Sequence, residues 1–240
     1  MSAPLDRPID FPLGNRLPFT LSIATREDEV REVCAHRGRL YSKEMPELGE
    51  RLREPEVLDR QAPGREIIVA RSRLDGEIIG SLRVHFNNEG PLPIESCIEF
   101  PEHMQGKLIM EGARLCSSAG PVCRSALVKA AIRLSQTHGA CFAALTARPR
   151  ISVIYESVGF KDLFEPNRVF PIPYVNNVEH RVMGMPLDPV SYHAATKAAM
   201  KPSVFDFYHA EHADAFDFSK ALPMGAHAKA MFAKQGAQSW

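Results

Sequence analysis

Two ionisable side chains interrupt an apolar run near the middle of the chain. Glu111 and Arg114 lie in LIMEGARLC (108–116), which otherwise has the composition of a buried strand. A charge on an interior strand is costly unless it is paired, so we expect one or both to face a cleft. A carboxylate in such a place suits a general base, because partial burial raises its pKa towards the operating pH. Strand alternation puts residues three apart on opposite faces, so we expect no simple ion pair between the two.

A structural role for Glu111 is the alternative. In that interpretation Glu111 pairs with Arg83 or Arg37 and only organises the core. Arg83 itself lies among apolar residues in SLRVHF (81–86), where a guanidinium can grip a carboxylate through two hydrogen bonds. Arg83 is equally compatible with the exposed side of a half-solvated strand, and the sequence leaves both alternatives open.

The residues after this run have the pattern of a helix start that can hold phosphate. Ser117 and Ser118 supply hydroxyls, Gly120 is flexible, Pro121 suits the first helical turn and Arg124 follows about one turn later. A helix N-terminus presents unpaired N–H groups and a partial positive charge, which together bind phosphate. An ordinary capped helix is the alternative interpretation.

Strand and helix patterns alternate around these residues and predict an α/β fold. A strand lacking polar residues before its end, as in ACFAALT, indicates that both of its faces are covered. The dipeptide Asp75-Gly76 predicts a hairpin between two of the strands. We expect strands at 19–25, 66–72, 77–86, 108–116, 140–146, 168–174 and 179–187, and helices at 26–45, after Pro121 and at 150–159.

Composition divides the chain into three parts. Residues 1–18 are rich in proline and polar side chains and are expected to form an arm. Residues 19–189 carry the strands and helices of one domain. Residues 190–240 are rich in Ala, His, Phe and Lys, and we expect a helical or partly disordered tail that packs on the body or on a second subunit of a homodimer.

The bulk properties are those of an ordinary globular protein. The 240 residues include 29 basic and 29 acidic side chains, and this net charge of +0 argues against nucleic acid as a partner. No apolar run approaches the roughly 20 residues that span a bilayer, and the first residues lack a signal pattern. The five cysteines form no Cys-x-x-Cys pair, so we expect reduced thiols, no metal site and a cytoplasmic location.

Several motifs resemble those of known acyltransferases. YESVGF (155–160), which closes a short helix after an apolar strand, resembles the GNAT acyltransferase fold. RGRLYSKEM (37–45), GSLRV (80–84) and EGARLCSSAG (111–120) resemble the motifs of bacterial N-acyl amino acid synthases and of the related acyl-homoserine-lactone synthases. The resemblance covers residues 21–189 and implies a three-layer GNAT-like fold with a central twisted mixed sheet.

The resemblance also implies a reaction, the transfer of a long-chain acyl group from a thioester to the amine of an amino acid. It implies that Glu111 helps to deprotonate the amine and that Arg114 shapes the same site or holds a carboxylate. Arg83 would face the acceptor, and Asp59 would match an acceptor-binding acidic residue of the lactone synthases. Tyr155 would protonate the departing thiolate.

The donor is expected to be acyl carrier protein or coenzyme A. The glutamine- or arginine-led glycine-rich loop usual for the fold is missing here, which favours an acyl carrier protein, whose arm offers a single phosphate to Ser117, Ser118, Gly120 and Arg124. A lactone-forming synthase ranks lower, because Trp240 is the single tryptophan and that family bears one near its N-terminus. An acetyl-CoA-dependent acetyltransferase and a non-catalytic acyl-chain binding protein are further alternatives.

Overall fold

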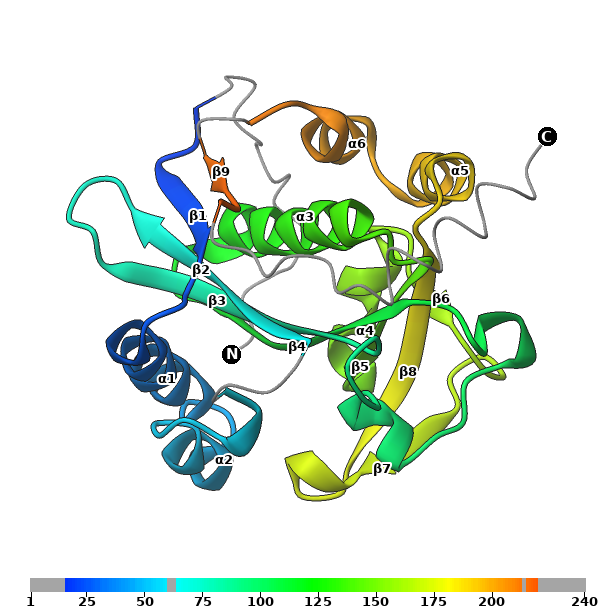
Figure 1. The fold of residues 1–240 in the computed structure, drawn as a ribbon, viewed down its shortest axis with the longest axis horizontal. Coiled ribbons are helices and arrows are strands. Elements are labelled where there is room, and N and C mark those ends of the chain that lie inside the picture. Colours follow the sequence, from blue (N-terminus) through cyan, green and yellow to red (C-terminus); the bar gives the residue numbers. More distant parts are fainter. Residues whose placement is uncertain (1–15, 60–63, 213–214, 220–240) are drawn as a thin grey trace.

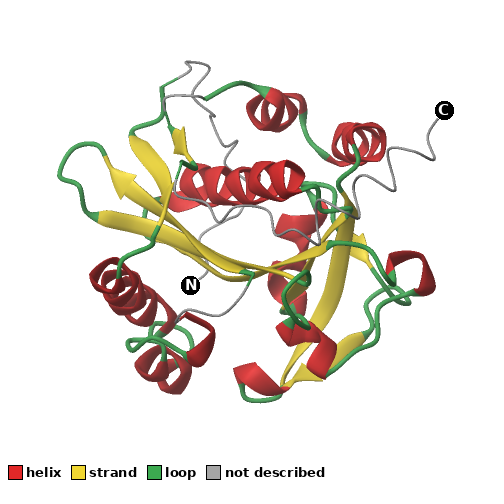
Figure 2. Cartoon of the chain, viewed as in Figure 1, coloured by secondary structure: helices red, strands yellow, loops and turns green. Residues whose placement is uncertain are grey.

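The computed structural model describes residues 16–59, 64–212 and 215–219. Within these ranges nine strands form one mixed sheet, with helices on both of its faces (Figures 1 and 2). The strands are β1 Phe19–Ile23, β2 Arg65–Ser72, β3 Ile78–Phe86, β4 Ile109–Ser117, β5 Phe142–Ala147, β6 Lys161–Asp162, β7 Val169–Ile172, β8 Val178–Pro186 and β9 Phe216–Asp217. The α-helices are α1 Glu27–Tyr41, α2 Pro46–Arg51, α3 Gly120–His138, α4 Pro149–Glu156, α5 Pro189–Ala199 and α6 Pro202–His209.

The strand order explains why β5 is apolar except for Thr146 near its end. The sheet runs β6-β8-β5-β4-β3-β2-β1-β9, with β7 paired to β8. The pairs β4–β5 and β1–β9 are parallel and the others are antiparallel. Helix α3 covers one face, and α1 and α2 cover the other (Figure 1). As a central strand of the sheet, β5 buries four of its six residues and leaves Phe142 and Thr146 partly exposed. The expected α/β class with a mixed sheet is confirmed.

The parallel pair β4–β5 is short, and the two strands part beyond it. Main-chain pairing joins Ile109–Gly112 to Phe142–Leu145. Beyond Gly112, β4 continues to Ser117 with no partner strand on its β5 side within the described residues. This divergence leaves a gap in the sheet, at the end of β4 that leads into α3.

A bulge in β4 corrects one prediction from strand alternation. Ala113 pairs with Arg83 and Cys116 pairs with Ser81, so two residues of β4 oppose one residue of β3. Arg114 lies at this bulge with a φ of 59°. The extra residue changes the alternation, so the prediction that Glu111 and Arg114 point to opposite faces is wrong.

The described residues also form four short 3₁₀ helices, and three of them, η1, η2 and η4, carry groups that contact the site. Their bounds are η1 Val57–Asp59, η2 Pro93–Ser96, η3 Glu102–Met104 and η4 Pro173–Val175. Helix η1 holds Asp59 beside α1 and β3, while η4 follows β7 and holds Tyr174. These short helices bring side chains to the sheet from parts of the chain that have no long periodic pattern.

The segment after β8 packs on α3. Tyr192 of α5 and Phe207 of α6 belong to the same buried core as α3. The Nζ of Lys129, on α3, donates hydrogen bonds to the carbonyl oxygens of Phe207 at 2.5 Å and Ala210 at 2.7 Å. The last carbonyls of a helix lack partners within the helix, so Lys129 satisfies the C-terminal end of α6.

The two expected terminal regions are described only in part. Of the arm expected at 1–18, residues 16–18 are described, and Leu17 is fully buried in the core. Of the expected tail, residues 220–240 lie outside the description, and a role for this tail in a homodimer stays a prediction. No helix among the described residues has the length and apolarity needed to cross a membrane.

Replacing Lys129 by methionine is expected to destabilise the protein. Methionine keeps much of the apolar stem but removes the donor to the Phe207 carbonyl oxygen, whereas the Ala210 carbonyl still accepts from Arg133 Nη2 at 2.7 Å. The loss is expected to cost about 1–3 kcal/mol in the free energy of unfolding. Thermal and urea unfolding measure this loss. Lys197→Met, at an exposed position of α5, is the matched control and should change stability by less than about 0.5 kcal/mol. Equal stability of the two variants would show that Lys129 does not hold α6.

Candidate active site

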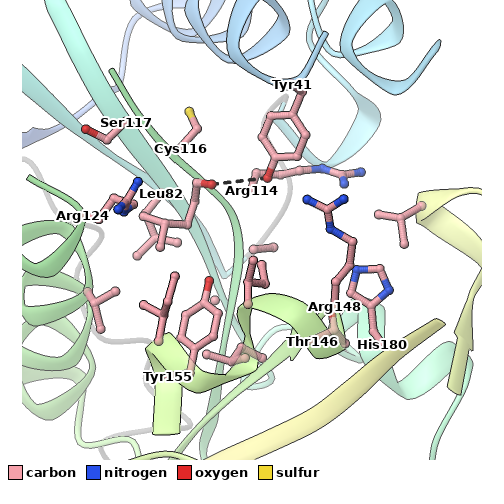
Figure 3. Close-up of a pocket in the computed structure, with 18 of the residues that line it drawn as sticks. Tyr41, Leu82, Arg114, Cys116, Ser117, Arg124, Thr146, Arg148, Tyr155 and His180 are labelled. Atoms are coloured by element: carbon pink, nitrogen blue, oxygen red, sulfur yellow. Dashed lines mark hydrogen bonds between the residues drawn. The ribbon is translucent and has the colours of Figure 1, made fainter. Parts of the chain in front are cut away.

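A cavity of about 530 Å³ lies where β4 and β5 part (Figure 3). A volume of this size suits a small-molecule substrate. One end is polar and carries Tyr41, Arg114, Thr146, Arg148 and His180. The other end carries Ser117 and Arg124, and an apolar wall comes from Leu82, Met110, Val128, Ala131, Ile132, Leu145, Ile151 and Phe160. The combination accommodates a long apolar chain together with charged groups at both ends.

A buried chain of alternating charges lies beneath the polar end. Arg37 Nη1 donates to both carboxylate oxygens of Asp59, at 2.9 and 2.8 Å. Arg83 Nη1 bridges Asp59 and Glu56, at 3.0 Å each. Arg114 then holds Glu56 through two hydrogen bonds, from Nε at 3.0 Å and from Nη2 at 2.8 Å. The three arginines and two carboxylates thus form one connected network of ion pairs.

The arginines keep the carboxylates of this network ionised. Burial alone would raise the pKa of Asp59, but Arg37 and Arg83 outweigh burial and lower that pKa to about 2. Burial would also raise the pKa of Glu56, but the hydrogen bonds and charge of Arg114, together with the charge of Arg83, outweigh burial and lower that pKa. With three guanidinium groups against two carboxylates, the network has one positive charge in excess.

The structure separates the sequence-predicted acceptor residues into two groups. Arg114 lines the cavity, whereas Arg83 and Asp59 lie among the charges behind it. Glu56 links them and was missed by sequence reasoning. Its signal is the spacing Glu56-x-x-Asp59, which places two carboxylates about one 3₁₀ turn apart.

Glu111 is buried next to the cavity and does not line it. Its Oε2 accepts a hydrogen bond from the backbone N–H of Ile94 at 2.9 Å, and its Oε1 accepts one from the hydroxyl of Tyr174 at 3.1 Å. Burial raises the pKa of Glu111 to about 7, and these two hydrogen bonds offset burial only in part. The sequence allowed Glu111 to pair with Arg83 or Arg37, but the hydrogen bonds of its carboxylate come from Ile94 and Tyr174 instead.

The expected phosphate site lies at the junction of β4 and α3. Ser117, Ser118 and Arg124 line the cavity there, and Ser117 and Arg124 flank the same end in Figure 3. The Ser117 hydroxyl donates to the carbonyl of Ile79 and accepts from the N–H of Ala119. These bonds hold the loop in place.

Gly120 opens α3 and does not itself line the cavity. Its φ is +78°, in the left-handed region that glycine adopts without strain. A side chain would be strained here, so Gly120 contributes to the junction through its backbone conformation.

Tyr155 lines the cavity with its phenol directed inwards (Figure 3). The ring packs edge-on against Phe160, with centroids 6.0 Å apart. Burial raises the pKa of the Tyr155 hydroxyl above its usual range, so the group is protonated at neutral pH. Tyr155 is thus a potential proton donor within the cavity.

Arg148 and Arg150 add positive charge at the edge of the cavity. Arg148 Nη2 donates to Glu44 Oε2 at 2.6 Å, and Arg150 also pairs with Glu44. Glu44 and Arg148 both line the cavity, from the end of α1 and from the start of α4. From the sequence, Arg148 and Arg150 form a basic cluster after a strand, which is compatible with contact to an acidic carrier protein or with ordinary surface arginines. The place of Arg148 in the cavity depends on the parting of β4 and β5.

Comparison with known proteins gives the family. The family model described as N-acyl amino acid synthase FeeM matches residues 47–183, which include Glu111, Tyr155 and every member of the network except Arg37. The chain belongs to the N-acyl amino acid synthase family. It is therefore an acyltransferase, and the resemblance inferred from its motifs is confirmed. No curated protein sequence matches the chain significantly.

Solved structures show the same fold. FeeM, an N-acyl amino acid synthase from uncultured soil microbes, aligns with a TM-score of 0.57 at 13% identity, over 75% of this chain and 96% of its own. TofI in a ternary complex with an inhibitor and MTA aligns with a TM-score of 0.52 at 16% identity, over 78% of this chain and 100% of its own. The CoA-dependent acyl-homoserine lactone synthase BjaI with MTA aligns with a TM-score of 0.53 at 12% identity, over 79% of this chain and 98% of its own. The GNAT-like fold expected for the synthase family is confirmed.

Among residues 16–59, 64–212 and 215–219, no three His, Cys, Asp or Glu side chains are grouped as they would be around a metal ion. The five cysteines are free thiols.

Asp59→Asn is expected to destabilise the synthase strongly. The substitution removes one of two negative charges that face Arg37 and Arg83, and breaking a fully buried ion pair costs about 3–5 kcal/mol. Urea unfolding measures the change. Asp206→Asn, at an exposed position of α6, is the control and should be within about 0.5 kcal/mol of wild type. A loss below about 1 kcal/mol for Asp59→Asn would mean that the arginines are compensated elsewhere.

Proposed function

We propose that this synthase transfers a long-chain acyl group from the thioester of an acyl carrier protein to the amine of an amino acid. The observation that carries the proposal is the cavity at the parting of β4 and β5, which combines an apolar wall with an adjacent buried carboxylate. The family match supports acyl transfer, and the residues below supply the finer assignments.

The donor lies along the gap in the sheet. The acyl chain occupies the apolar wall beside α3, where Ile132 and Leu145 are among the lining residues. The phosphate of the carrier's arm binds at Ser117, Ser118 and Arg124, with the N-terminus of α3 adding its partial charge. Beyond Gly112, β4 has no partner strand on its β5 side among the described residues. The Leu115 carbonyl there accepts a hydrogen bond from the Tyr41 hydroxyl at 3.3 Å, and the other main-chain groups on that side are available to the amides and the carbonyl of the thioester.

The acceptor occupies the polar end. Arg114 and Arg148 reach towards each other across this end (Figure 3), so a carboxylate fits between the two guanidinium groups. Glu56 holds Arg114 in place through two hydrogen bonds. Asp59 and Arg83, which lie behind Glu56, act as positioning residues in this proposal.

The reaction forms one bond and breaks one. The amine nitrogen attacks the thioester carbonyl carbon, the C–N bond forms and the C–S bond breaks. Glu111, with its pKa near neutrality, receives the proton that the amine loses. Tyr155 donates a proton to the departing thiolate and is reprotonated from water.

Glu111→Gln should abolish most of the product. Mass spectrometry of lipid extracts from cells overproducing wild type should detect long-chain N-acyl amino acids, at levels reduced at least about 100-fold by the variant. Glu54→Gln, at an exposed position, is the matched control and should form product like wild type. Equal product from wild type and Glu111→Gln would remove Glu111 from the mechanism.

The same carboxylate sets a pH dependence. Because burial raises the pKa of Glu111 to about 7, the group is protonated below that pH and cannot accept the amine proton. In steady-state assays kcat/KM of wild type should therefore fall as pH decreases through about 7. The pH profile of Glu111→Gln should lack this acidic limb, that is, the fall of kcat/KM as pH decreases through about 7.

Donor choice can be measured with the same acyl group on both carriers. The single-phosphate site predicts a higher kcat/KM for acyl carrier protein than for coenzyme A. Arg124→Ala should raise the donor KM about 10-fold or more, since a hydrogen bond to a charged group contributes about 1.5–3 kcal/mol. Arg31→Ala, exposed on α1, is the control. A preference for coenzyme A, with no effect of Arg124→Ala, would contradict the assignment.

A further inference from the structure

The proposed base is separated from the cavity. Both carboxylate oxygens of Glu111 are hydrogen-bonded, to Ile94 N–H and to the Tyr174 hydroxyl, and Glu111 does not line the cavity. A general base must lie within hydrogen-bond reach of the proton it takes, directly or through an intervening group. The amine proton therefore needs a route to Glu111.

Tyr174 occupies that route. Tyr174 is one of the residues that line the cavity, and its hydroxyl donates to Glu111 Oε1 at 3.1 Å. Thr146, which also lines the cavity, is a second hydrogen-bonding neighbour of the Tyr174 hydroxyl. The Tyr174 hydroxyl thus lies between a residue of the cavity wall and the buried carboxylate.

The position of Tyr174 is fixed by its backbone. The carbonyl oxygen of Tyr174 accepts hydrogen bonds from Arg114 Nη2 and Arg51 Nη2, each at 3.2 Å. Arg51 also binds the side chain of Asn176, two residues further along. The charged network therefore reaches Tyr174 through Arg114 and holds the short helix η4 against the polar end of the cavity.

We propose that Tyr174 relays the amine proton to Glu111. As the amine attacks the thioester, its proton moves to Tyr174 Oη while the hydroxyl proton of Tyr174 moves to Glu111 Oε1. Tyr174 is neutral before and after this transfer, and Glu111 then returns its proton to water. The relay rests on the proposed function, and it makes Tyr174 a catalytic residue, because its hydroxyl touches the substrate amine.

The surroundings favour a concerted transfer. Burial, together with the neighbouring Glu111, raises the pKa of the Tyr174 hydroxyl above its usual range, which disfavours a free tyrosinate. The charged groups around Glu111 act in opposite directions, since Arg83 lowers its pKa and Glu95 raises it. Both protons are therefore expected to move together, without a charged phenolate in between.

A double-mutant cycle tests the relay. Tyr174→Phe removes the hydroxyl and keeps the ring, and we expect kcat to fall about 100-fold or more, with loss of the limb near pH 7. If Tyr174 and Glu111 act as one unit, the double variant Tyr174→Phe/Glu111→Gln should be no slower than either single variant. Tyr192→Phe, buried in α5 away from the cavity, is the matched control, and thermal unfolding verifies that each variant is folded.

The outcomes separate the relay from the proposed function. No product from wild type with any amino acid would overturn the proposed function and the relay with it. Product from wild type with unchanged kcat in Tyr174→Phe would overturn the relay alone. Multiplicative losses in the double variant, or a retained limb near pH 7 in Tyr174→Phe, would also overturn it and leave Tyr174 a structural role.

A second measurement needs no variant. Rates of wild type in mixtures of H₂O and D₂O report how many protons move in the rate-limiting step. Two protons in transit give a curved dependence on deuterium fraction, as the relay requires when acyl transfer limits the rate, which a single-turnover experiment establishes. A linear dependence under those conditions contradicts the relay.

Discussion

The cost of removing charge from water constrains this fold more than any other interaction. Arg37, Asp59 and Arg83 are almost fully enclosed, and each is tolerable only while its partners are in place. These partners come from α1, η1 and β3, with Glu56 extending the chain of charges to β4. Elements far apart in sequence are therefore fixed relative to one another by a requirement for charge balance. The same requirement positions Arg114 at the cavity, so the stability of the core and the geometry of the polar end have a common origin.

The irregular features of β4 convert this rigid frame into a site. The bulge at Arg114 places its guanidinium beside Glu56 and the Tyr174 carbonyl, where a regular strand would have pointed it the other way. The parting from β5 after Gly112 then opens space for a substrate beside main-chain groups that a longer parallel pair would have occupied. A regular β4 paired to β5 along its whole length would add main-chain hydrogen bonds to the sheet but would leave no space for a substrate. Departures from ideal geometry of this kind are expected where function competes with regularity.

Sequence patterns predicted the elements well and their finer geometry less well. The apolar ACFAALT indicated a central strand, and the serines and proline after β4 indicated the helix start, because both signals are local. The prediction that the side chains of Glu111 and Arg114 point to opposite faces was wrong. Alternation of side chains holds only for a regular strand, and a bulge leaves no clear mark in composition. Glu56 and Tyr174 lie in or beside short helices between longer elements, where periodicity is too brief to be read. Their importance comes from contacts across more than 50 positions of sequence.

The short junction between β4 and β5 has a mechanical consequence. Main-chain hydrogen bonds connect the two halves of the sheet along only four residues of each strand. The free portion of β4, Ala113–Ser117, is about 16 Å long at about 3.3 Å per residue. With the junction as pivot, each degree of opening moves the far end of that portion by about 0.3 Å, as the rise per strand residue implies. Because strand pairing joins β4 to β5 over these four residues, an angular change there would alter the width of the cleft, while the pairing with Gly80 and Ser81 keeps β4 joined to β3.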